Sequence, residues 1–158
     1  MGLADRAGQR KMKFWGTEQV VFDACGLDTS AIVEVGLRAT HCEVVVTQME
    51  RMGDLAVGAP SLVEAALVLQ QRFGYDPRPW LEGFVRNSRL EVIPFEYEHY
   101  HLAAEAFLLY GKGRHPERLN LGDCLSYAGA KVAGRPLLYI GEDFARTEVA
   151  SVLPGPLV

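Results

Sequence analysis

Short apolar segments alternate with longer segments of helical spacing along most of this chain. The apolar segments are typical of buried strands and lie near residues 20–27, 55–60, 90–95 and 136–141. Between them, apolar residues recur three and four positions apart, as on the buried face of a helix. The alternation predicts an α/β fold: a mostly parallel central sheet covered by helices on both faces, as a three-layer α/β/α sandwich.

Three other segments are assigned from weaker patterns. Residues 43–52 and 80–86 favour helices, and a short final helix is expected over residues 142–149. His99 and His101 fall two positions apart on an expected helix and therefore face different sides, so we expect ordinary surface or boundary residues there.

Length and charge limit the organisation of the chain. Its 158 residues suit one domain, expected over residues 20–152, between an N-terminal extension of uncertain order (1–19) and a C-terminal tail (153–158). The net charge of −4 argues against nucleic-acid binding driven by overall charge alone, although it leaves room for a local basic groove.

The cysteines and apolar runs indicate a location. Cys25, Cys42 and Cys124 form no C-x-x-C pair, so neither a zinc ribbon nor a redox motif is indicated. Free thiols are typical of the reducing cytoplasm, which is the location we expect. No apolar run reaches the length of a membrane span, and no signal peptide is recognised.

Four carboxylates fall near expected junctions between strands and helices: Asp28, Glu64, Asp123 and Asp143. Because the carboxyl ends of parallel strands meet at one edge of a sheet, these side chains are expected to gather there. Crowded carboxylates repel one another unless a cation joins them, and their hard oxygen atoms suit magnesium or manganese.

Helix capping is the alternative interpretation of the same residues. Ser61 with Glu64, and Asn120 with Asp123, have the spacing of capping boxes. Asp28 and Asp143 are then simple caps or first-turn acids. The two interpretations are compatible, because a helix start also favours an ionised carboxylate.

Four motifs follow one another between Val20 and Val149. They are LDTSAIV at 27–33, APSLVEA at 59–65, YGKGRHP at 110–116 followed by LNLGDC at 119–124, and PLLYIGEDF at 136–144. Together they resemble the acidic motifs of PIN domains, in particular those of the VapC toxins of bacterial VapBC toxin–antitoxin pairs. Each motif alone is weak, whereas the ordered set with its glycine–lysine–glycine–arginine–histidine loop is specific.

The resemblance implies an endoribonuclease that uses Mg²⁺ or Mn²⁺, is neutralised by a cognate VapB-type antitoxin, and forms a homodimer. Transferred by position, the catalytic and metal-holding acids are Asp28, Glu64, Asp123 and Asp143. Ser30 and Asn120 lie beside them as supporting residues, and Glu142 is the alternative to Asp143 as the fourth acid.

A basic loop before Asp123 supplies candidate contacts to RNA. Lys112, Arg114, His115 and Arg118 are placed to bind phosphates near the acids. The alternative is a solvated basic loop at a helix end, where the helix dipole favours cations in any case.

Other functions stay open on the sequence alone. A catalytically silent PIN-like module would bind RNA or protein, and the same carboxylates would serve a DNA nuclease or a phosphohydrolase on another α/β fold. One phosphatase pattern, D-x-D-x-T, is absent at Asp28. Trp80, Leu81 and Phe84 form an apolar group that we assign to core packing, with an antitoxin helix or a dimer partner as the alternative.

Overall fold

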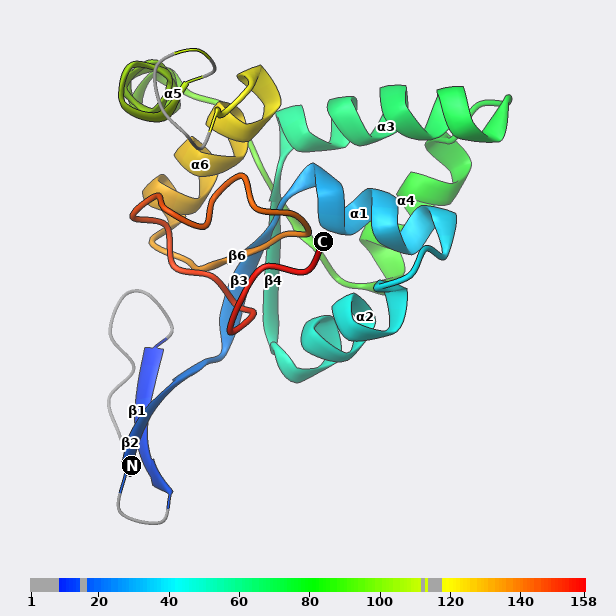
Figure 1. Cartoon of the computed structure of the whole chain (residues 1–158). Helices are drawn as coiled ribbons and strands as arrows, with labels where there is room; N and C mark the ends of the chain where they lie inside the picture. Colours follow the sequence, from blue (N-terminus) through cyan, green and yellow to red (C-terminus); the bar gives the residue numbers. More distant parts are fainter. Residues whose placement is uncertain (1–8, 15–16, 112, 114–117) are drawn as a thin grey trace.

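The computed structural model describes residues 9–14, 17–111, 113 and 118–158. A sheet of four parallel strands, in the order β5-β4-β3-β6, forms its centre. These strands are β3 (Ala24–Leu27), β4 (Asp54–Gly58), β5 (Glu91–Ile93) and β6 (Leu137–Leu138). Helices cover both faces of the sheet (Figure 1), so the expected three-layer α/β/α sandwich is confirmed.

Two apolar cores lie on the two faces of the sheet. The helices are α1 (Thr29–Leu37), α2 (Cys42–Arg51), α3 (Ala59–Phe73), α4 (Arg78–Asn87), α5 (Tyr97–Tyr110) and α6 (Leu121–Ala133). One core joins the sheet to α1, α2, α3 and α4, and the other joins it to α5 and α6. Leu137 and Leu138 of β6 enter different cores, because successive side chains of a strand point to opposite faces.

The helices expected over 43–52 and 80–86 are confirmed as α2 and α4, whereas the short final helix is wrong. Residues 142–149 form turns and bends. The amides of Ala145 and Thr147 bond carbonyls three residues earlier, and the hydroxyl of Thr147 also donates to the Phe144 carbonyl at 2.9 Å. The Phe144 ring is buried against Tyr139, with 5.0 Å between ring centroids. These local bonds compete with a helical ladder.

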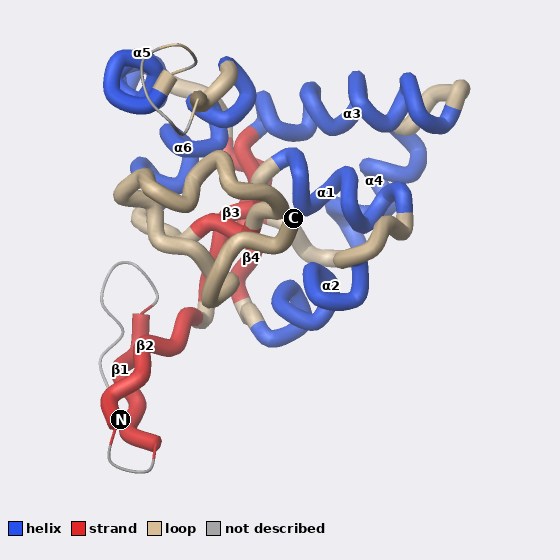
Figure 2. The backbone as a smooth tube through the Cα atoms, viewed as in Figure 1, coloured by secondary structure: helices blue, strands red, loops and turns tan. Residues whose placement is uncertain are grey.

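The start of the chain forms a hairpin of its own. Strands β1 (Gln9–Phe14) and β2 (Thr17–Phe22) pair antiparallel as a separate two-stranded sheet (Figure 2). The strand expected from residue 20 is therefore divided at Asp23, and β3 begins after it. Strand β3 leads directly into Asp28, so Asp28 lies at the carboxyl end of the central sheet and Asp23 at its amino end.

His99 is buried, which corrects its expected place at the surface or boundary, whereas His101 is exposed as expected. The Nδ1 atom of His99 accepts the Glu96 amide at 3.1 Å, closing the capping box of α5. Over the described residues, no helix has the length and apolar character needed to cross a membrane.

Candidate active site

Asp28 is buried where β3 runs into α1, and it caps that helix. Its Oδ2 atom accepts the Ser30 amide at 2.9 Å and the Ser30 hydroxyl at 2.6 Å. The Asp28 amide donates to the Leu138 carbonyl at 3.0 Å, and the Ile140 amide donates to the Ser30 hydroxyl at 3.0 Å. Ser30 therefore joins the first acid to the loop that follows β6.

Ser61 does not cap α3, so the capping box expected from Ser61 and Glu64 is wrong. The helix begins at Ala59, with Gly58 as its N-cap and a proline in the first turn, a position that proline favours. Ser61 is consequently a buried helical residue, and its hydroxyl lies 3.1 Å from the hydroxyl of Ser126 on α6.

Glu64 lies one turn into α3 and faces α1 and α6. Its Oε2 atom accepts the hydroxyl of the buried Thr29 at 2.7 Å. A Cβ atom built at Gly122 on α6 would overlap both carboxylate oxygens of Glu64. The missing side chain at Gly122 therefore leaves the space that this carboxylate occupies.

Asp123 and Asn120 form the capping box expected at the start of α6, and this prediction is confirmed. The Asn120 side chain accepts the Asp123 amide, and Oδ2 of Asp123 accepts the Asn120 amide, both at 2.9 Å. Asp123 is only 9% exposed, although it carries a carboxylate.

The four acids interact around Asp123. The pKa of Asp123 is raised to about 7, chiefly by burial and also by the charges of Asp28, Asp143 and Glu64, against the lowering effect of the Asn120 amide. A carboxyl group in such company holds its proton near neutral pH unless a cation joins the group. The structure thus places three of the predicted carboxylates within electrostatic reach of the fourth, Asp123.

Asp143 and Glu142 are both exposed, in the turn that follows Gly141. Gly141 has a φ of 104°, a backbone conformation that favours glycine. The charge of Asp143 acts on Asp123, which favours Asp143 as the fourth acid.

The donor set has the oxygen chemistry that suits a divalent ion. Within the described part of the chain, no three acidic, histidine or cysteine side chains already converge as a ready-made ion site. The hydrogen bonds described above use one oxygen each of Asp28, Glu64 and Asp123. Their second oxygens, together with Asp143, are hard ligands of the kind that Mg²⁺ and Mn²⁺ accept.

The expected RNA contacts are described only in part. Lys112, Arg114 and His115 lie outside the described residues. Arg118 is exposed and has a φ of 54°, two residues before Asn120.

Two further residues, Thr29 and Gly122, contribute to the site but were not predicted for it. Both stand inside the quoted motifs, beside the acids.

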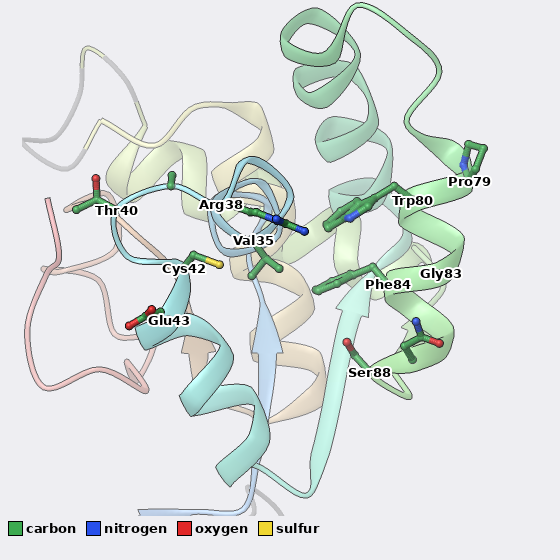
Figure 3. Close-up of a pocket in the computed structure, with 12 residues that line it drawn as sticks. Val35, Arg38, Thr40, Cys42, Glu43, Pro79, Trp80, Gly83, Phe84 and Ser88 are labelled. Carbon is green, nitrogen blue, oxygen red and sulfur yellow. The ribbon is translucent and has the colours of Figure 1, made fainter.

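A groove of about 780 Å³ lies apart from the acids, between α4 and the turn that joins α1 to α2. Trp80 and Phe84 of α4 stack on its wall, with ring centroids 5.1 Å apart, and Arg38 extends toward them (Figure 3). Both rings also pack against the first core, as expected, and Leu81 is buried within it.

Comparisons with known proteins agree with these features. The PIN domain model matches residues 26–150. Ribonuclease VapC30 of Mycobacterium tuberculosis is 35% identical over 126 residues, covering 80% of this chain and 96% of that protein. Ribonuclease VapC36 of the same organism is 37% identical over 124 residues, covering 78% and 89%.

Solved structures share the fold. The sarcin-ricin loop cleaving toxin VapC20 of M. tuberculosis has a TM-score of 0.66 at 18% identity, covering 82% of this chain and 99% of that one. VapBC2 of Rickettsia felis, bound to a DNA fragment from its promoter, has a TM-score of 0.63 at 19% identity, covering 81% and 96%. The resemblance drawn from the four motifs is confirmed: this chain belongs to the PIN domain family, among the VapC proteins.

Proposed function

We propose that this protein is a metal-dependent endoribonuclease toxin that cleaves RNA phosphodiester bonds and is neutralised by a cognate antitoxin. The observation that carries the proposal is the electrostatic coupling of Asp28, Glu64 and Asp143 to the buried Asp123. Relatives that align over most of their own length are named ribonucleases, which supports the reaction class.

Asp28, Asp123, Asp143 and Glu64 would hold Mg²⁺ or Mn²⁺. When bound, the ion supplies Lewis-acid stabilisation of the charge that develops on the phosphate and lowers the pKa of water. The chain's own residues set the geometry. Ser30 fixes the carboxylate of Asp28, Thr29 fixes that of Glu64, and Glu64 orients the attacking water. Lys112, Arg114, His115 and Arg118 bind phosphates of the RNA next to the acids.

A cognate VapB-type antitoxin is the proposed inhibitor, and the groove at Trp80 and Phe84 is its proposed docking place. The stacked rings offer an apolar wall to a segment of the antitoxin, and Arg38 offers a cation that favours a segment with an acidic residue. Two of the structural neighbours are toxin–antitoxin complexes, which supports a partner of this kind.

A homodimer is proposed through the apolar face of α3, α5 and α6. Val63, Leu67, Leu108 and Leu121 are 61%, 58%, 62% and 74% exposed there. They line two adjoining grooves of about 680 and 650 Å³. A contiguous apolar surface on three helices is typical of an interface, and a second copy would cover it.

The domain limits of 20–152 and the cytoplasmic location stay predictions.

Cleavage of total RNA by the purified protein tests the function, with Mg²⁺ or Mn²⁺ against EDTA. We expect discrete metal-dependent fragments, and a loss of at least about a hundredfold in Asp28→Asn, Asp123→Asn and Asp143→Asn, since each 1.4 kcal/mol or so of barrier is tenfold. Glu142→Gln is the matched control and retains activity. If the folded protein cleaves nothing with any metal, the catalytically silent binding module is the correct function.

A further inference from the structure

The β1–β2 hairpin is an addition to the family fold. Its strands pair in register from Gln9 opposite Phe22 to Phe14 opposite Thr17, and in the described residues neither strand joins the central sheet. The PIN domain model begins at residue 26, after the hairpin. The alignment with VapC30 uses 96% of that protein, so almost nothing of it remains to form a corresponding hairpin.

The charge of this segment is opposite to that of the rest of the chain. Residues 1–22 contain four basic and two acidic residues, so residues 23–158 carry twelve basic and eighteen acidic residues, a net charge of −6. Three of the basic residues, Arg10, Lys11 and Lys13, lie on the single strand β1. A polyanion is therefore attracted to the hairpin and repelled by most of the body that carries the acids.

We propose that the β1–β2 hairpin is an RNA-binding arm that holds the phosphate backbone of a large substrate RNA, a role that rests on the proposed ribonuclease function. The arm leaves the amino end of β3, whereas Asp28 follows its carboxyl end. Figure 1 shows the hairpin projecting away from the helices that carry the acids.

The separation defines the class of substrate. The four residues of β3 and the six-residue strands of the hairpin extend for roughly 13 and 20 Å at about 3.3 Å per residue. These fully extended lengths are upper limits, and the pairing of Arg10 with Val21 puts the first basic residues near the base of the hairpin. An RNA that contacts both places must follow β3 from its carboxyl end to beyond its amino end. The substrate is therefore an RNA long enough to follow this path, and a trinucleotide, at about 3.4 Å per stacked nucleotide, reaches only the acidic site.

The test uses the full chain with Arg10, Lys11 and Lys13 all replaced by Gln. The matched control replaces Arg51, Arg72 and Arg86, three exposed arginines of the body, by Gln, and changes the net charge equally. Binding of purified bulk ribosomal RNA is measured against salt in an Asp28→Asn background. Cleavage of ribosomal RNA and of trinucleotide RNAs is measured in the active background.

We expect the hairpin variant to bind ribosomal RNA at least about tenfold more weakly at low salt, with a shallower salt dependence by about 0.7–0.9 per lost phosphate contact. Its cleavage of trinucleotide RNAs is unchanged, and the control variant behaves as the parent does. Equal affinity of both variants for ribosomal RNA would overturn the proposed RNA-binding role of the hairpin. A changed oligomeric state with unchanged RNA affinity would also overturn it, and would show that the hairpin contacts a second copy of the chain.

Failure of the arm and failure of the nuclease are distinguishable. If RNA binding depends on the hairpin but no metal-dependent cleavage is seen, the RNA-binding role of the hairpin stands and the proposed ribonuclease function is wrong. If the hairpin variant cleaves ribosomal RNA normally and binds it with the affinity of the parent, the ribonuclease function stands and the RNA-binding role of the hairpin is wrong.

Discussion

Asp123 both closes the capping box of α6 and stands among three other carboxylates. Capping and metal binding at this residue are therefore compatible, as the sequence suggested, because one oxygen bonds the Asn120 amide and the other is left for a ligand. Burial and the three neighbouring charges both disfavour the ionised form of Asp123, so its pKa is raised.

That pKa makes metal-free stability depend on pH. A pKa of about 7 in the folded chain, against an ordinary value of 3.8, means that folding retains a proton that the unfolded chain releases. The stabilising contribution is present below about pH 4 and is lost as the pH rises through 7. In EDTA, we expect the free energy of unfolding in urea to fall between pH 5 and 8 by up to a few kcal/mol. Asp123→Asn should flatten this slope; an equal slope in both proteins contradicts the assignment.

Gly122 allows a direct test of the space held for Glu64. Gly122→Ala places a methyl group where the Glu64 carboxylate lies, so we expect RNA cleavage to fall by about ten- to a hundredfold while the chain stays folded. In the control Gly129→Ala, on the same helix, the new Cβ meets nothing within 4 Å. Both changes favour helix formation by up to about 1 kcal/mol. Equal activity in the two variants would show that Gly122 has no such role.

The acids were predictable because each stands in a motif at a strand or helix boundary. Thr29 and Gly122 were not, since their roles depend on how α1 and α6 approach α3. The contacts between these helices involve residues more than thirty positions apart in the sequence, so no local sequence pattern predicts them.

At the scale of elements, helices with strong apolar periodicity were predicted correctly. The starts of helices and the segment after the last strand were predicted less well, because their local sequence signals are ambiguous. The Ser61 capping box was wrong because Pro60 is compatible with the first turn and α3 starts earlier. The helix over residues 142–149 was wrong because the buried ring of Phe144 and the hydroxyl of Thr147 hold a series of turns. In both places a tertiary or side-chain contact outweighed a weak local preference.

Helix α4 provides the test of the antitoxin groove. Gly83 lines the groove, and a Cβ built there meets nothing within 4 Å. Gly83→Leu therefore fills the groove without removing packing. We expect at least tenfold weaker binding of the cognate antitoxin in calorimetry, with unchanged RNA cleavage by the free enzyme. Glu82→Leu, on the same helix outside this groove, is the control. Parental affinity in Gly83→Leu places the antitoxin elsewhere.

For the molecule as a whole, the single sandwich followed from strand and helix alternation, whereas the hairpin did not. Its residues are mixed and polar, and the pairing of β1 with β2 leaves no alternating apolar signal in β1. The size and course of the apolar face over α3, α5 and α6 also emerge only when the helices are assembled.

The dimer prediction belongs to this scale. Leu67→Glu and Leu108→Glu each place a charge within the apolar face, and burying an unpaired charge is costly. We expect sedimentation equilibrium to show monomers for both variants and dimers for the parent. Tyr75→Glu, an exposed aromatic residue that lines none of these grooves, is the control and stays dimeric. If the parent is itself a monomer, the apolar face has another occupant.

The sheet order β5-β4-β3-β6 places the last strand made beside the first strand of the sheet, and Asp123 and Asp143 both follow residue 120. Translation therefore delivers half of the acids, and the strand that anchors the loop around Ser30, only after the other three strands of the sheet. A domain generally folds as a unit during synthesis. A growing chain consequently has no complete acidic site, and the activity of a finished toxin begins only once the surfaces that its partner would cover are also complete.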